Sequence, residues 1–284
     1  MPKASGQALP PTLTPMANAA GETPLVFLPD LGGNVMYARK ILPHLSGRVA
    51  AFGMRFDRDM IGRLELASLA EIGDRFAADL IASPLAPPYR LVGHSFAGLV
   101  AYETACGLAR QGVDPGGGVA AVILLDTGLP RHLCALKGAP VGQALYRLRE
   151  TAKFAFQTAR DAWIRRRAET GRAEILAAKG YLRIDLKGHP ESYRFILKGL
   201  YRAMIEYQPS RYPGGVTVLR ATSRKLPAGY PPDFGWGRYA DGGVRMLDIA
   251  TDHLAMVRED AAAAQTALRI GELLAEARLA GLEA

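Results

Sequence analysis

The sequence has few cysteines and no long hydrophobic run. Its 284 residues include only Cys106 and Cys134, too few for a disulfide framework and without the spacing of a metal site. No apolar stretch approaches the roughly 20 residues that a membrane-spanning helix needs. Residues 1–22 contain prolines and alanines but no continuous apolar segment typical of a secretory signal. We therefore expect a cytoplasmic protein with reduced thiols and no membrane span.

Acidic residues are in the minority, and the positive excess is confined to one segment. The chain has 35 Lys and Arg against 27 Asp and Glu, a net charge of +8. Residues 131–205 alone hold 16 Lys and Arg and 6 Asp and Glu, an excess of +10, which leaves −2 for the rest. This segment has no recognisable nucleic-acid-binding motif, so we expect no nucleic acid partner. Its charge fits either a solvated helix face or a docking surface for an acidic protein.

Short apolar runs alternate with segments of helical periodicity. Such alternation predicts the α/β class with a mostly parallel, doubly wound sheet. The expected strands are 24–29, 49–54, the run that ends at 93, 120–125, 216–220 and 244–249, and the expected helices are 35–45, 68–81, 99–110, 143–167, 190–206 and 259–282.

The most informative stretch joins one of these strands to the next helix. It reads Tyr-Arg-Leu-Val-Gly-His-Ser-Phe-Ala-Gly over residues 89–98. A serine in such a strand–turn–helix setting is typical of the nucleophile elbow of α/β-hydrolases, in which a sharp turn exposes the serine hydroxyl. The motif usually has glycine two residues after the serine, where this chain has Ala97. The sequence thus predicts Ser95 as a nucleophile.

A serine nucleophile needs a base, and the base needs an orienting carboxylate. Asp126 directly follows the run 120–125, and His253 comes shortly after the run 244–249. The chain order serine, aspartate, histidine is that of α/β-hydrolases. Carboxyl ends of parallel strands meet at one sheet edge, so we expect Ser95, Asp126 and His253 to form a catalytic triad there.

The same mechanism requires two backbone N–H donors for the oxyanion. One donor is expected from Phe96, the residue after the nucleophile, and the other from Asp30 or Leu31 in the loop after the first strand. A carboxylate beside a developing anion is unfavourable, so Asp30 must point away or Leu31 is the donor. Asp252 is a rival for the orienting role, but it adjoins the histidine in sequence and reaches its ring with difficulty. We expect structural or solvent-facing roles for His44, His94, His132 and His189.

The strand–helix rhythm stops after Pro130 and resumes near residue 206. In hydrolases such an interruption is commonly a helical lid over the site. We therefore predict a flexible leader at 1–22, a core at 23–130 plus 206–284, and a basic helical lid insertion at 131–205.

Five segments resemble the thioesterase domains of nonribosomal peptide and polyketide synthetases. The likeness lies in the motif order and spacing, and the departures are Ala97 and Thr251, usually glycine, and Asp30, usually small or apolar. The matching segments are Phe-Leu-Pro-Asp-Leu-Gly-Gly at 27–33 with Tyr37, Gly-His-Ser-Phe-Ala-Gly-Leu-Val-Ala-Tyr-Glu at 93–103, Leu-Leu-Asp-Thr at 124–127, Tyr-Gln-Pro-Ser-Arg-Tyr-Pro-Gly-Gly-Val at 207–216, and Phe-Gly-Trp at 234–236 with Thr-Asp-His-Leu-Ala-Met at 251–256.

The resemblance implies a substrate acylated on the phosphopantetheine of an acyl or peptidyl carrier protein, released by hydrolysis or cyclisation. It implies no cofactor and no metal on the chain itself. Carrier proteins are commonly acidic, so the basic lid is the expected docking surface. Two other interpretations stay open at this point: a small-ester or acyl-CoA hydrolase with the same triad, and a non-enzymatic interaction module that keeps the fold.

Overall fold

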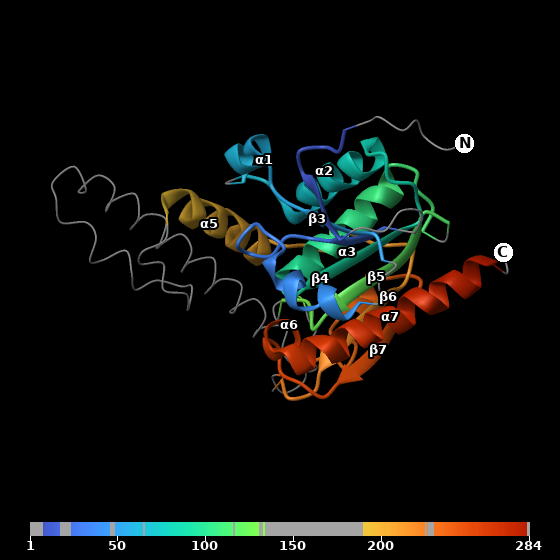
Figure 1. The fold of residues 1–284 in the computed structure, drawn as a ribbon. Coiled ribbons are helices and arrows are strands. Elements are labelled where there is room, and N and C mark those ends of the chain that lie inside the picture. The colour runs from blue at the N-terminus through green and yellow to red at the C-terminus, as the bar shows by residue number, and fades with distance from the viewer. Residues whose placement is uncertain are drawn as a thin grey trace, which may run out of the picture.

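A computed structural model describes residues 8–17, 24–45, 49–64, 66–115, 117–130, 133, 190–224, 226 and 230–282. Within these residues one seven-stranded sheet has the order β1-β3-β2-β4-β5-β6-β7 (Figure 1). Strands β2 to β7 run parallel, and β1 pairs antiparallel with β3. The mostly parallel sheet is confirmed. The strands are β1 (Leu13–Ala17), β2 (Leu25–Phe27), β3 (Ala51–Met54), β4 (Tyr89–His94), β5 (Val119–Leu125), β6 (Val216–Ala221) and β7 (Val244–Ile249).

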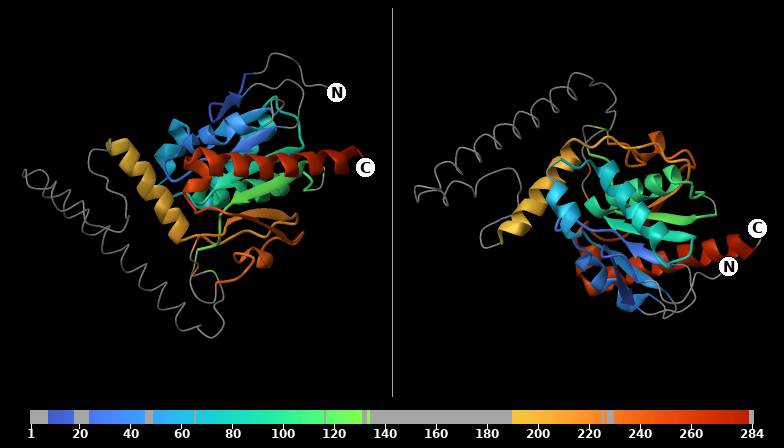
Figure 2. Two further views of the ribbon diagram at one scale, coloured as in Figure 1. Left: turned by 60° about the horizontal axis from the view of Figure 1, so that its bottom comes forward. Right: turned by 90° about the horizontal axis from the view of Figure 1, so that it is seen from above.

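Helices cover both faces of the sheet, as Figure 2 shows. Alternate residues of β2 divide between the layers: Val26 joins the core with α2 and α3, while Leu25 and Phe27 join the core with α7. This two-sided burial explains why the strands read as continuous apolar runs. The helices are η1 (Met36–Lys40), η2 (Leu42–His44), α1 (Arg58–Arg63), α2 (Leu69–Ala82), α3 (Phe96–Arg110), α5 (Glu191–Ile205), η4 (Trp236–Arg238), α6 (Ala255–Arg258) and α7 (Asp260–Leu282).

Part of the expected leader belongs to the sheet. Residues 13–17 form β1, Leu13 is buried, and the hydroxyl of Thr12 donates to Asp79 on α2 at 2.7 Å. The prolines of this segment indicated a loop, but Pro15 is tolerated here because β1 is an edge strand, where a missing N–H costs little. By pairing with β3, the segment covers what would otherwise be an open sheet edge.

Two other expectations differ from the structure or lie outside it. In place of the expected helix at 35–45, the structure has two short 3-10 helices, η1 and η2, and Pro43 lies near the start of η2. Of the lid insertion, the expected helix at 190–206 is present as α5, whereas the expected helix at 143–167 lies outside the described residues.

Helix α3 is buried along almost its whole length, including the charged residue Glu103. The Glu103 carboxylate accepts hydrogen bonds from the Tyr207 hydroxyl at 2.8 Å, the Ser210 amide at 2.9 Å and the Ser210 hydroxyl at 2.7 Å. The Tyr102 hydroxyl binds the carbonyls of Ser210 and Tyr239 at 2.9 and 2.8 Å. These contacts attach the segment after α5 to the elbow helix.

We predict that Glu103→Ala lowers the free energy of unfolding by about 3 kcal/mol or more, because it leaves three donors without their acceptor. Ser210→Ala is the matched control. It removes one hydroxyl donor and keeps the carboxylate partnered by two others, so we expect a loss of about 1 kcal/mol. Urea unfolding followed by circular dichroism measures both. Equal losses in the two variants would show that the carboxylate is not the organising group.

Candidate active site

Ser95 lies on a strained turn between β4 and α3. Its φ of 55° is in a region that non-glycine residues rarely adopt, and it is the N-cap residue of α3. The turn is also crowded: a Cβ at Gly93 would lie 2.1 Å from the Ala97 carbonyl oxygen, and one at Gly98 would lie 2.0 Å from the Thr127 hydroxyl. Ala97 itself is fully buried, so its methyl group fits this tight packing. The local structure is the sharp elbow that the sequence predicted.

The structure brings Ser95, His253 and Asp126 into one hydrogen-bonded chain. The Nε2 atom of His253 lies 3.1 Å from the Ser95 hydroxyl oxygen. Its Nδ1 atom lies 2.6 Å from Oδ2 of Asp126. An ionised carboxylate only accepts, so Nδ1 carries the proton and the Nε2 lone pair faces the serine hydroxyl. This is the arrangement in which a histidine can remove the serine proton.

Asp252 does not take part in this chain. Its carboxylate accepts hydrogen bonds from the amides of Leu254 and Ala255, at 2.8 and 2.9 Å, at the start of α6. These bonds lower the pKa of Asp252. The neighbour of the histidine thus stabilises the turn that leads into α6.

The loop geometry favours Leu31 over Asp30 as the second oxyanion donor. The Asp30 amide donates to the Asn34 carbonyl at 2.9 Å, so this N–H is already engaged. The Asp30 carboxylate turns toward its own loop and accepts from the Gly32 amide at 2.8 Å, while burial raises its pKa. Leu31 and Phe96 line the cavity at Ser95, and within the described residues their amides have no backbone acceptor. Leu31 is therefore the better candidate.

A cavity of about 510 Å³ contains Ser95 and His253. Met36 and Leu254, two of the few large apolar side chains that are well exposed, line it together with Leu197 of α5. Lys40 and Arg258 add positive charge. The other lining residues are Asp30, Leu31, Gly32, Tyr37, His94, Phe96, Tyr193 and Val257.

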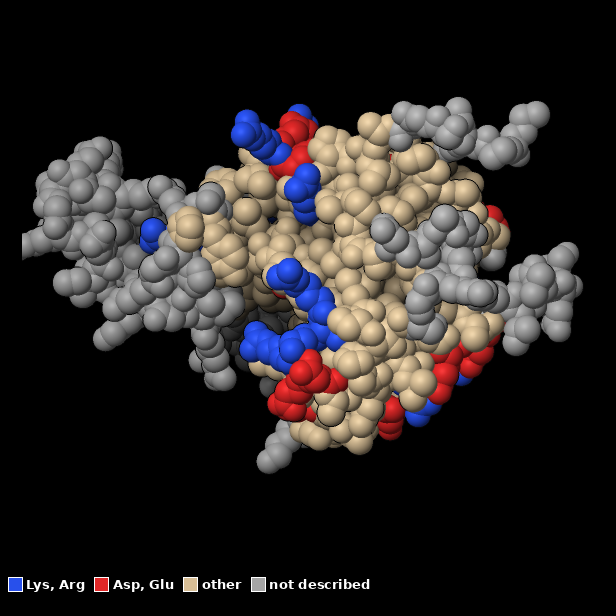
Figure 3. Space-filling model, viewed as in Figure 1, with Lys and Arg blue, Asp and Glu red and all other residues tan. Residues whose placement is uncertain are grey.

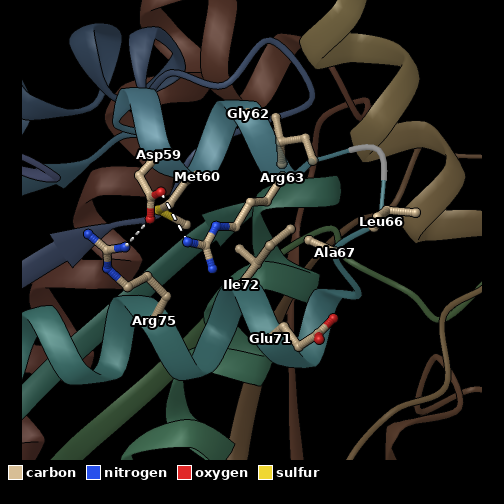
Figure 4. A pocket seen from close by; sticks show the side chains of 10 residues that line it. Asp59, Met60, Gly62, Arg63, Leu66, Ala67, Glu71, Ile72 and Arg75 are labelled. Carbon is tan, nitrogen blue, oxygen red and sulfur yellow. Dashed lines mark hydrogen bonds and ion pairs between the residues drawn. The ribbon is translucent and has the colours of Figure 1, made fainter.

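A second cavity of about 540 Å³ lies between α1 and α2 (Figure 4). Asp59 sits in its wall between Arg63 and Arg75 and forms an ion pair with each, at 3.3 Å in both cases. Its lining contains no serine, histidine or cysteine. In this it differs from the cavity at Ser95, where a serine and a histidine lie together.

Sequence reasoning assigned no role to three residues that support the site, although two of them, Thr127 and Trp236, lie in segments that carry the family resemblance. Arg224, in the turn after β6, forms an ion pair with Asp126 at 2.9 Å. The Thr127 hydroxyl donates to the Ser95 carbonyl at 3.0 Å, and the Trp236 indole donates to the Thr127 carbonyl at 2.8 Å. Arg224 follows a strand that neighbours β5, so inspecting every strand end along the sheet edge would have found it.

Three further features of the described residues concern a thiol, metal-binding groups and the length of the apolar helices. Cys106 is buried in the core, which raises the pKa of its thiol. Among the described residues, no group of three or more His, Cys, Asp or Glu side chains gathers as a metal site. No helix in the described part of the chain combines the length and apolarity needed to cross a membrane.

Residues 23–152 match the model of the thioesterase domain family, which confirms the resemblance seen in the motifs. No sequence among the curated proteins matches this chain. Among solved structures, a four-domain nonribosomal peptide synthetase, holo-AB3403, matches with a TM-score of 0.63 and 16% identity over 95% of this chain and 20% of its own. This chain thus spans about a fifth of that synthetase.

Two single domains match over nearly their whole length. The Vlm2 thioesterase domain has a TM-score of 0.57 and 18% identity, with 92% of this chain and 96% of the domain covered. The type II thioesterase BorB, from a borrelidin biosynthetic cluster, has a TM-score of 0.57 and 17% identity, with 95% and 98% covered. These likenesses show that the chain has the α/β-hydrolase fold.

His94 offers a pH-dependent test of the packing around the site. Its Nε2–H donates to the His253 carbonyl at 2.7 Å, and burial, with the neighbouring His253, lowers the pKa of His94 to about 4. An unfolded histidine has a pKa near 6.5. Between these values the unfolded state binds the proton more strongly, so stability falls as the pH drops from about 6.5 toward about 4.

We predict that His94→Gln, whose amide can still donate to that carbonyl, loses this pH dependence. The difference in unfolding free energy between pH 7 and pH 4.5 is expected to be smaller than in the wild type by on the order of 2 kcal/mol. His44→Gln, at an exposed position, serves as the control and should behave like the wild type. An unchanged pH dependence in His94→Gln would contradict the buried neutral imidazole.

Proposed function

We propose that this chain, which matches the thioesterase domain family and forms a hydrogen-bonded Ser95–His253–Asp126 chain, is a serine thioesterase. Its substrate is an acyl or peptidyl chain on the phosphopantetheine of a carrier protein. The observation that carries the proposal is the contact of His253 with Ser95 on one side and Asp126 on the other. The family match and the structural neighbours support the thioester substrate.

The first half of the proposed reaction transfers the acyl group to the protein. His253 Nε2 takes the hydroxyl proton of Ser95 as the serine oxygen attacks the thioester carbonyl carbon. The amides of Phe96 and Leu31 stabilise the oxyanion of the tetrahedral intermediate. The carbon–sulfur bond then breaks, and the imidazolium returns its proton to the departing thiolate.

The second half frees the acyl chain. A water molecule loses a proton to His253 and attacks the carbonyl carbon of the acyl-Ser95 ester. The bond between that carbon and the Ser95 oxygen then breaks, and the imidazolium returns the proton to the serine oxygen, which releases the free acid and restores the serine. An amine or hydroxyl within the acyl chain can replace water, and the product is then a ring. All the groups needed belong to the chain, so the proposed reaction requires no cofactor and no metal.

The positive charges of Lys40 and Arg258 are suited to binding an anionic substrate arm. They come from η1 and α6, which pack against each other, and both line the cavity at Ser95. Figure 3 shows Lys and Arg side chains gathered beside the hollow near α6. Lys40 also pairs with Asp260 at 2.7 Å, but both side chains are exposed, so solvent weakens this ion pair and Lys40 is free to turn. A phosphodiester is a good ligand for such a pair.

The carrier protein is the proposed partner, with the lid at 131–205 as its docking surface. The support is the excess of +10 in that segment, since acidic partners are attracted to basic surfaces. Most of the segment lies outside the described residues. A cytoplasmic location is part of this proposal.

The decisive test measures release of free acid from acyl-loaded carrier protein. We predict release by the wild type, none with Ser95→Ala, and a fall of about 10³- to 10⁴-fold in kcat with Asp126→Asn. Asp252→Asn is the matched control, because the asparagine oxygen can still accept from the amides of Leu254 and Ala255, and it should retain activity.

Two results would contradict the carrier assignment. Carrier proteins that stay loaded while an acyl-CoA or aryl ester turns over through Ser95 would favour the small-ester or acyl-CoA hydrolase. Failure of all acyl donors would favour the non-enzymatic module.

A second prediction concerns the cationic pair. With an acyl-phosphopantetheine thioester, the double variant Lys40→Ala/Arg258→Ala should raise KM about tenfold or more and leave kcat unchanged, because two charge-assisted contacts are lost. With the same acyl group on pantetheine, which has no phosphate, its KM should equal that of the wild type. Arg39→Ala, on the same 3-10 helix but outside the cavity lining, is the control. Equal KM changes for both substrates would contradict a phosphate contact.

A further inference from the structure

The Asp126 carboxylate binds three donors, and His253 is only one of them. Its Oδ2 accepts from His253 Nδ1 at 2.6 Å and from Arg224 Nη1 at 2.9 Å. Its Oδ1 accepts from the Ala221 amide at 3.1 Å. The side chain of Asp126 is fully buried, while that of Arg224 is 34% exposed. A guanidinium therefore shares the carboxylate oxygen that orients the histidine.

Arg224 holds the backbone of Asp126 as well as its side chain. The same Nη1 donates to the Asp126 carbonyl oxygen at 2.9 Å. Asp126 has a φ of 44°, a conformation that is rare outside glycine. The guanidinium carbon lies 5.9 Å from the centroid of the Phe234 ring, which packs on one side of it. These contacts fix both the arginine and the residue that it binds.

The charge of Arg224 also compensates the buried carboxylate. A buried carboxylate is costly unless it is paired and hydrogen-bonded, and the guanidinium supplies an opposite charge beside the Ala221 amide. The Arg224 charge also contributes to lowering the pKa of the neighbouring His94.

We propose that Arg224 is a positioning residue that fixes the Asp126 carboxylate against His253. This inference rests on the proposed catalytic role of the Ser95–His253–Asp126 chain.

Other charged or titratable side chains line the cavity around His253, but they do not hold the Asp126 carboxylate. They are Asp30, Tyr37, Lys40, His94, Tyr193 and Arg258. In the described part of the chain, the hydrogen bonds to that carboxylate come from Ala221, Arg224 and His253. Changing Arg224 therefore removes a direct, charged contact to Asp126.

The test follows the rate at which a fluorophosphonate labels Ser95, measured by intact mass at one pH for all variants, beside the unfolding temperature of each. This probe reports activation of the serine and does not depend on the acyl substrate. Arg224→Gln removes the charge and keeps a hydrogen-bond donor, whereas Arg224→Lys keeps the charge and is the conservative rescue. Arg245→Gln is the control, since Arg245 lies on the neighbouring strand β7 but pairs with the exposed Glu276.

We expect Arg224→Gln to lower the labelling rate by about tenfold or more, because a carboxylate that is held less firmly orients His253 less well. Arg224→Lys should recover part of that loss, since its ammonium still binds the carboxylate, and Arg245→Gln should label like the wild type.

A labelling rate in Arg224→Gln equal to that of Arg245→Gln would overturn the inference, as would equal losses in Arg224→Gln and Arg224→Lys. Should Arg224→Gln fail to fold, a wild-type rate in Arg224→Lys overturns it and a lower rate in folded Arg224→Lys supports it. A wild type that is not labelled at Ser95 overturns both this inference and the proposed function. Normal labelling without thioester turnover overturns the proposed substrate alone.

Discussion

The burial of the Asp126 carboxylate is the constraint on which the site depends. A buried charge is costly unless donors surround it, and here they come from the turn after β6 and from the loop after β7. Satisfying this one group therefore aligns the ends of three neighbouring parallel strands. The Ser95 elbow is then joined to the same edge through the Thr127 hydroxyl.

Packing around α3 provides the rigidity that this alignment needs. The helix is buried on the sheet side and on the outer side, where Tyr102 and Glu103 bind the chain that returns after α5. Close approach at Gly93 and Gly98 leaves no room for the elbow to relax. The strain at Ser95 is therefore held by contacts on every side, which is the condition under which such conformations persist.

Much of this organisation could be read from the sequence, and the reasons are local. Strands buried on both faces produce continuous apolar runs, so β4, β5 and β7 were placed almost to the residue. The elbow has a compact signature, and Asp126 and His253 follow strand ends in the expected order. The edge strand β1 was not predicted because its prolines and exposed residues are typical of a linker and because its pairing is non-local.

Non-local contacts also explain why the roles of the supporting residues were not predicted. Arg224 and Trp236 lie about 100 positions from the groups that they bind, at 98 and 109 residues respectively, and neither lies in a local motif that indicates its partner. The choice between Asp30 and Leu31 depended on one backbone hydrogen bond to Asn34, which no residue pattern reveals. Sequence patterns thus located the reacting groups, whereas the contacts that hold them required coordinates.

The account's central claim is that Ser95 becomes acylated, and rapid-quench mass spectrometry tests it most directly. The wild type is mixed with an acyl-loaded carrier protein, quenched within milliseconds to seconds, and mapped by peptide. The account predicts a transient acyl group on the peptide that contains Ser95, which disappears as free acid accumulates. Acid release with no acylated intermediate, or an acyl group on another residue, would contradict it.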